Sequence, residues 1–183
     1  MSVSELSTST QNYLKAIWGL KEWSSEPVTA TLIAKQLGLK LSSVSDAVRK
    51  MAKQGLVSHT PYGSVELTEL GRQYALVMVR RHRLLESFLV QALGYTWDEV
   101  HNEAENLEHA VSDMLIERVD KFLDYPTRDP HGDPIPTVDG QITIPSAHRL
   151  TDSGAQSQVT VERISDSDPQ LLKFLEERGI VTG

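Results

Sequence analysis

The segment from His101 to His109 carries residue types that bind divalent metal ions. At 100° per residue, His101, Glu105, Glu108 and His109 fall within about a third of a turn on one helix face. A face that packs into an apolar core would carry Leu, Val or Ala at these positions. Imidazole nitrogens and carboxylate oxygens are instead the ligands of borderline and hard divalent metals.

A second pair at the same i, i+4 spacing, His82 and Glu86, lies on the preceding predicted helix. An isolated pair of this kind is most often part of a solvated polar face. Leu107 and Val111, however, indicate that the segment starting at His101 also packs against other residues. Two ligand pairs on adjacent helices can close a shared site, so we expect a metal centre there.

Composition limits the class of protein. The chain has 183 residues, of which 39% are hydrophobic, enough for one compact domain or two to three small ones. No apolar run approaches the roughly 18 residues that cross a bilayer, and the first residues do not form a signal peptide. The absence of cysteine excludes disulfides and thiolate ligands and fits a reducing compartment. We therefore expect a soluble, cytoplasmic protein.

Charge is distributed unevenly along the chain. The net charge is −7, yet residues 1–75 hold eight Lys and Arg against six Asp and Glu, whereas residues 76–183 hold ten against nineteen. A mildly basic first part permits DNA contact, and an acidic second part permits cation binding.

The first part of the chain has the pattern of a helix-turn-helix. Apolar spacing predicts a helix over residues 9–23 and a shorter one over 28–38 that ends at a glycine. We expect Ser42 or Ser43 to cap a third helix that ends at Gly55. Two short helices joined by a tight turn are typical of DNA-binding proteins.

A hairpin and two long helical segments follow. Alternating residues predict strands over 56–60 and 64–68, joined by a turn at 61–63, which completes a winged helix. A long helix is expected from 68 to 93, and a second from 96 to 123 with a kink near its middle. The apolar face near the end of the second could close the core or pack against another copy of the chain.

The sequence of the last third of the chain predicts few helices or strands. Residues 126–147 are rich in Pro and Gly and read as a turn followed by a linker. A strand is expected over 158–164 and a helix over 168–179. One strand and one helix cannot bury a core, so this part is an incomplete domain or docks on the rest.

The chain resembles the diphtheria toxin repressor family of metal-dependent repressors. The resemblance rests on a winged helix followed by RHRLLE at 81–86, HxxxExxEH at 101–109 and GDPIP at 132–136. It implies a mainly α protein with a winged helix-turn-helix DNA-binding domain (1–75), a helical dimerisation and metal-binding domain (76–148) and the start of an SH3-like domain (149–183). It also implies a homodimer, not an enzyme, that binds palindromic operators when Mn(II) or Fe(II) is present.

The same resemblance implies two metal sites. Glu105 stands where iron-type members have Cys and manganese-type members have Glu, and a carboxylate hardens the site towards Mn(II). The primary site would comprise Asn12, Glu105, Glu108 and His109. The ancillary site would comprise His82, Glu86, His101, Asp168 and Gln170. Asn12 departs from the family, which has Met or Asp at that position.

DNA contact is expected from the third helix and the wing. Ser hydroxyls can meet bases or phosphates, and Lys and Arg mostly bind phosphates. The candidate residues are Lys40, Ser42, Ser43, Ser45, Asp46, Arg49, Lys50 and Tyr62.

Two other functions compete with a metal-sensing repressor of metal-homeostasis genes. A winged-helix regulator could sense a small organic ligand, in which case His82, Glu86, His101 and His109 would be structural. A metal-dependent hydrolase is disfavoured, because no base or nucleophile other than the ligands themselves is placed beside them.

Overall fold

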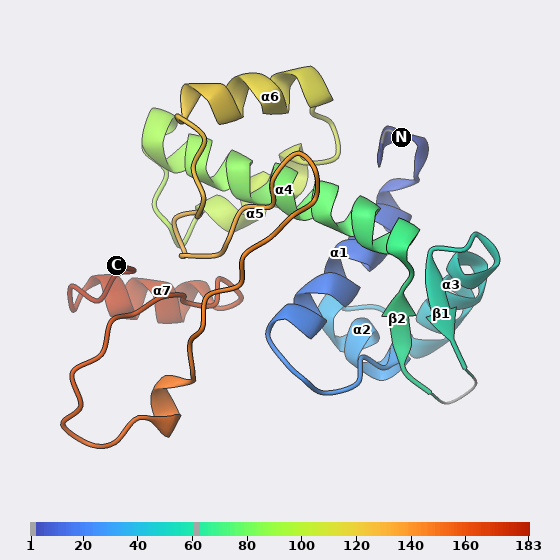
Figure 1. Cartoon of the computed structure of the whole chain (residues 1–183), viewed down its shortest axis with the longest axis horizontal. Coiled ribbons are helices and arrows are strands. Elements are labelled where there is room, and N and C mark those ends of the chain that lie inside the picture. The colour runs from blue at the N-terminus through green and yellow to red at the C-terminus, as the bar shows by residue number, and fades with distance from the viewer. Residues whose placement is uncertain (1–2, 61–62) are drawn as a thin grey trace. The chain divides into compact units, whose positions relative to one another are not determined.

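The computed structural model describes residues 3–60 and 63–183. The chain divides into two compact units, Met1–Val79 and Arg80–Gly183, and each is described by itself below. The long green helix of Figure 1, α4 (Glu69–Leu93), begins in the first unit and continues into the second.

The first unit is a winged helix, as predicted. Its elements in chain order are η1 (Val3–Glu5), α1 (Thr8–Glu22), α2 (Ala30–Leu37), α3 (Leu41–Lys53), β1 (Val57–His59) and β2 (Val65–Leu67). The two strands pair antiparallel, with Ser58 opposite Glu66. The predicted turn between them includes residues 61 and 62, which lie outside the described part of the chain.

Local capping sets the helix boundaries in this unit. The side chains of Ser7 and Thr29 accept hydrogen bonds from backbone N–H groups in the first turns of α1 and α2. Gly38 ends α2 with φ of +64°, a left-handed conformation that glycine adopts without strain. The predicted serine cap of α3 is wrong, because the helix starts at Leu41 and Lys40 occupies the cap position.

One apolar core holds the first unit together. Val44 and Val48 of α3 are fully buried, so this helix is fixed by its inner face and its opposite face stays in solvent. Val57 and Val65 bring the hairpin onto the same core. The helix that would read DNA is therefore held rigidly by the fold.

The second unit places three helices around the candidate metal-binding residues. They are the later part of α4, α5 (Val100–Leu107) and α6 (Asp113–Phe122). The helix predicted over 96–123 with a kink near its middle is instead two helices. It breaks after Leu107, and Ser112, close to the expected kink, caps a new helix by accepting from Leu115 N at 3.2 Å. Glu108 and His109 consequently lie in a turn and not on a helix face.

The last part of the chain belongs to the second unit. It contains the short η2 (Leu150–Asp152) and α7 (Pro169–Glu176). The strand predicted over 158–164 is wrong, because that segment has no partner strand and instead lies against a turn, with Ile164 N donating to His131 O at 2.9 Å. The segment therefore docks on the rest of the unit, which was the second of the two expectations.

An SH3-like arrangement does not appear among residues 149–183, which contain no strand. None of the helices in the described ranges 3–60 and 63–183 is long and apolar enough to span a membrane.

Candidate metal centre

His82 of α4 lies at the middle of a cluster of metal-binding side chains. Its Nδ1 atom is 2.6 Å from Oε2 of Glu108, so one ring nitrogen faces the turn after α5. Its Nε2 atom is 3.0 Å from Oε1 of Glu86 and 3.2 Å from Nδ1 of His101. Glu86 lies one turn along α4, which explains why the i, i+4 spacing found both residues.

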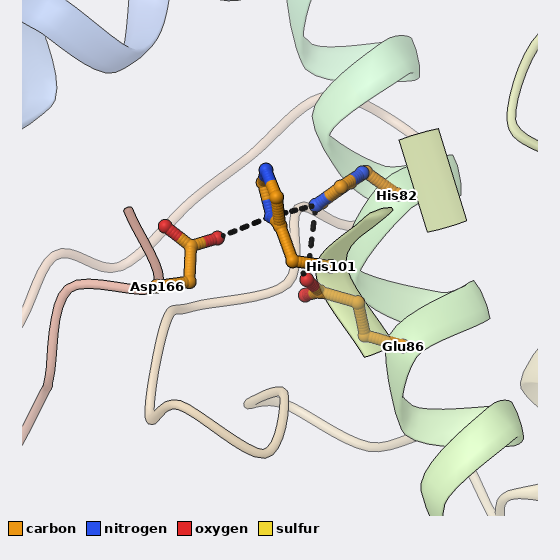
Figure 2. Close-up of side chains that lie close together, drawn as sticks. All are labelled: His82, Glu86, His101 and Asp166. Carbon is orange, nitrogen blue, oxygen red and sulfur yellow. Dashed lines mark hydrogen bonds and ion pairs between the residues drawn. The ribbon is translucent and has the colours of Figure 1, made fainter. Parts of the chain in front are cut away.

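His101 joins the cluster from α5. Figure 2 shows its ring between His82 and Asp166, with Glu86 below. His101 Nδ1 is 2.8 Å from Oδ2 of Asp166 and 3.4 Å from Oε1 of Glu86. These four residues each offer a donor atom within 4.8 Å of the others, close enough to hold one metal ion.

A second set of donors forms on the other side of His82. His82, Glu105 and Glu108 also offer donor atoms within 4.8 Å of one another. His109 Nε2 is 3.4 Å from Oε1 of Glu108, so it borders this group. The break in the predicted helix turns the fully buried carboxylate of Glu108 towards α4, where it meets His82.

A third set includes residues that the sequence did not single out. Asp129 and His131 follow α6 in a tight turn and share Glu86 with the cluster just described. His131 is fully buried, with Nε2 2.7 Å from Trp97 O and Nδ1 3.8 Å from Oε2 of Glu86. Their only sequence signal was an Asp and a His two positions apart in a Pro/Gly-rich stretch, which does not show that the stretch folds back on α4.

The electrostatics of the cluster are those of closely packed acids and bases. Burial by itself would lower the pKa of His101, but hydrogen bonds to Asp166 and Glu86 outweigh it and raise the pKa to about 10. Burial alone would raise the pKa of Glu86, yet His82, His101 and His131 together hold that pKa well below its usual range. His101 and Glu86 are therefore charged at neutral pH when no metal is bound.

Asp129 is a buried carboxyl close to two other acids, with Arg83 beside it. Burial raises the pKa of its carboxyl well above the usual range, and the neighbouring carboxylates of Glu86 and Asp133 raise it further. A divalent cation beside Glu86 would relieve this repulsion and would satisfy donors that are otherwise costly to bury. The residues present thus fit a divalent metal with oxygen and nitrogen ligands.

Two predicted ligands, Asp168 and Gln170, lie outside the cluster. Asp168 caps α7 by accepting hydrogen bonds from Gln170 N and Leu171 N, and Gln170 is exposed on that helix. Asp166, two residues before Asp168, is the carboxylate that reaches His101. Asn12 belongs to the first unit, where its Oδ1 atom is buried and accepts no hydrogen bond from the described residues.

Two arginines beside the cluster pair with local carboxylates. Arg80 Nη2 lies 2.6 Å from Asp120, and both side chains are nearly buried. Arg81 is fully buried, with Nη2 2.5 Å from Asp113 and Nη1 donating to Glu108 O at 3.4 Å. Arg81 therefore holds the turn that carries Glu108 against α4.

The candidate DNA-contacting face lies on α3. Its exposed residues are Lys40, Ser42, Ser43, Asp46, Arg49 and Lys50. Ser45 is half-buried, and its hydroxyl donates to Leu41 O at 2.9 Å. Arg49 pairs with Asp46, but both side chains are 70% exposed, so the pair is weak and easily exchanged for a phosphate. Tyr62 lies outside the described residues.

Comparison with known proteins identifies the family. Residues 5–65 match the iron dependent repressor N-terminal DNA binding domain, and residues 68–137 match the iron dependent repressor metal binding and dimerisation domain. The iron-dependent repressor IdeR of Mycobacterium tuberculosis is 35% identical over 98% of this chain and 83% of its own length. The chain belongs to the diphtheria toxin repressor family.

Other members of the family agree. The diphtheria toxin repressor of Corynebacterium diphtheriae is 36% identical over 75% of this chain and 60% of its own length. A solved manganese-dependent transcriptional repressor in complex with manganese is 53% identical, with a TM-score of 0.90 over 94% of this chain and 79% of that one. The apo form of the manganese-activated repressor ScaR is 34% identical, with a TM-score of 0.80 over 93% of this chain and 80% of that one.

Family membership settles the general function. The chain is a metal-dependent, DNA-binding transcriptional repressor with a divalent metal as its cofactor. The comparisons support DNA and a second copy of the chain as its partners. They give no support to the alternative regulator that senses an organic ligand.

Proposed function

We propose that this protein senses Mn(II), with Fe(II) as the other metal that its ligands admit, and represses metal-homeostasis genes by binding palindromic operators as a homodimer, with no enzymatic activity. The observation that carries the choice of metal is the donor set around His82, which consists of carboxylates and imidazoles without a thiolate. Such hard and borderline ligands suit Mn(II) and do not exclude Fe(II). The 53% identical relative that binds manganese supports the same choice.

Glu105, Glu108 and His109 form the primary site in this proposal. The proximity of His82 to Glu105 and Glu108 adds a second imidazole to that set. Asn12 remains the proposed fourth ligand from the first helix. The buried and unsatisfied oxygen of its side chain supports this role, since a buried amide oxygen normally accepts a hydrogen bond.

Glu86 and His101 form the ancillary site, with Asp166 as the acceptor that we substitute for Asp168 and Gln170. His82 belongs to the ancillary site, with Nε2 facing Glu86, while its other ring nitrogen, Nδ1, faces the carboxylate of Glu108. When bound, the metal supplies positive charge that holds these side chains together. The protein's own residues fix the distances and exclude water from the buried carboxylates.

α3 is the proposed recognition helix. Its residues Lys40, Arg49 and Lys50 would bind phosphates, and Ser42, Ser43, Ser45 and Asp46 would meet bases or the backbone, with Tyr62 reaching in from the wing.

Two copies of the chain are needed to read a palindrome, because each copy supplies one recognition helix about 34 Å from the other. α6 is the proposed interface. Its side chains Met114, Leu115 and Phe122 are 69%, 46% and 66% exposed, whereas apolar side chains of this size are usually buried. The match of residues 68–137 to a metal binding and dimerisation domain supports this choice.

A titration of protein and palindromic DNA with Mn(II) tests the proposal. Fluorescence anisotropy of the DNA should show tight binding only with metal, and light scattering should give two chains per site. Glu105→Ala should abolish the response to metal, because it removes a carboxylate from the primary site. Glu103→Ala removes the same charge from the same helix outside all three donor groups, so its response should stay normal. A full metal response in Glu105→Ala would refute the assignment.

A further inference from the structure

The segment 161–166 lies against the turn formed by residues 128–133. Ile164 N donates to His131 O at 2.9 Å, and Arg128 Nη1 donates to Glu162 O at 3.1 Å. Gly132 has φ of +84°, and a Cβ atom there would come within 2.1 Å of Glu162 O. Only glycine therefore permits the two backbones to approach so closely.

Asp133 is the ionic link between this segment and α4. Its Oδ1 atom is 2.5 Å from Nε of Arg163, and its Oδ2 atom is 3.4 Å from Nη2 of Arg83. Arg83 also donates to Pro134 O at 2.6 Å. The side chains of Arg83, Asp133 and Arg163 are each only 8% exposed. A buried pair of this kind leaves a strongly unfavourable charge behind when one partner is removed.

Apolar contacts align the same segment with α5. Ile164 is buried in a small core with Trp97 and Leu172. Trp97 precedes His101 by four residues, and Ile164 precedes Asp166 by two. Docking Ile164 on Trp97 therefore brings Asp166 towards His101, where their atoms are 2.8 Å apart.

We propose that Arg163 and Asp133 are positioning residues that hold Asp166 at the ancillary metal site. Both act by fixing the segment that carries Asp166. The inference rests on the proposed function, because it takes Asp166 to be a ligand. It adds that metal affinity at this site depends on an ion pair placed outside the ligand set.

Arg163→Met tests the proposal, since Met keeps the long apolar side chain and loses the charge. The Glu105→Ala chain provides the background, so that only the ancillary site responds to Mn(II) in a calorimetric titration. Residues that orient ligands typically change metal affinity by about 10-fold to 100-fold. Arg163→Met should weaken Mn(II) binding by that factor, and Arg163→Lys should recover part of it.

Arg128→Met is the matched control. Arg128 contacts Glu162 of the same segment at both its backbone oxygen (3.1 Å) and its carboxylate (2.7 Å), but these contacts are exposed, with side chains 43% and 39% exposed. An exposed pair contributes little, so this variant should bind Mn(II) nearly as the background does. Equal losses in the Arg128 and Arg163 variants would overturn the proposal, because the buried ion pair would then have no special role.

A double-mutant cycle separates positioning from a general loss of stability. If Arg163 acts through Asp166, then Asp166→Asn should remove most of the effect of Arg163→Met, and the two losses should not add. Additive losses would overturn the proposal. Asp133→Asn provides an independent variant, which should reproduce the loss seen in Arg163→Met.

The outcomes also separate this inference from the proposed function. A native chain that binds no Mn(II) would refute the proposed function. Native binding together with unchanged affinity in both Arg163→Met and Asp133→Asn would refute only the positioning role. In a chain that carries His101→Gln, the titration with Mn(II) reports the primary site. Adding Arg163→Met to that chain should leave the Mn(II) affinity of the primary site unchanged.

Discussion

Mn(II) binding at the ancillary site should depend steeply on pH. A metal ion needs the lone pair of a neutral imidazole, so it must displace the proton that His101 carries in the metal-free protein. The pKa of that imidazole is about 10: burial alone would lower it, but hydrogen bonds to Asp166 and Glu86 outweigh burial. At pH 7 the ring is therefore almost entirely protonated.

The size of the effect follows from that value. Three pH units separate neutral pH from a pKa of about 10, so deprotonating His101 at pH 7 costs about 4 kcal/mol. Affinity should rise about tenfold per pH unit between pH 7 and pH 10, with about one proton released per metal from this residue. Glu86 and Asp166 add no protons, because the pKa of each carboxyl is lowered and both are already ionised.

Calorimetry of the Glu105→Ala chain, in two buffers of different ionisation enthalpy, measures the protons released on Mn(II) binding. Adding His101→Gln should reduce that number by about one and flatten the dependence on pH. Equal proton release with and without His101 would refute the reasoning, because the displaced protons would then come from other groups.

The same pKa values set the stability of the metal-free protein. The pKa of His101 is raised by folding, so its contribution is fully present below about pH 6.5 and is lost as the pH rises through about 10. The pKa values of Glu86 and Asp166 are lowered, so their contributions are present above the unfolded values and are lost as the pH falls. This buried cluster is thus most stabilising above the unfolded pKa values of the two carboxyls and below about pH 6.5.

Two further predictions concern the first unit. Asn12→Asp should raise Mn(II) affinity on the order of tenfold, because it adds a negative charge to the proposed primary site. Calorimetry of the full chain measures this affinity, and an unchanged value would place Asn12 outside the site. Arg49→Ala and Lys50→Ala should each weaken binding to all DNA sequences alike and lower the salt slope of binding by about one unit, whereas a changed sequence preference would make that residue a base reader.

The sequence by itself determined the winged helix and the centre of the candidate metal site. The apolar spacing of α1 and α3, the glycine that ends α2 and the alternation in β1 and β2 are local signals, and local hydrogen bonds and caps suffice to read them. His82 and Glu86 were visible for the same reason, since residues four apart in a helix share a face.

Only the tertiary structure decided which donors meet. Glu108 reaches His82 because the helix breaks after Leu107 and the buried Arg81 of α4 donates to Glu108 O, which holds that turn against α4. Asp166 replaced Asp168 as the partner of His101, because Asp168 caps α7 while Ile164 docks on Trp97. Contacts between distant segments are set by packing and buried ion pairs, which leave no periodic pattern in the sequence.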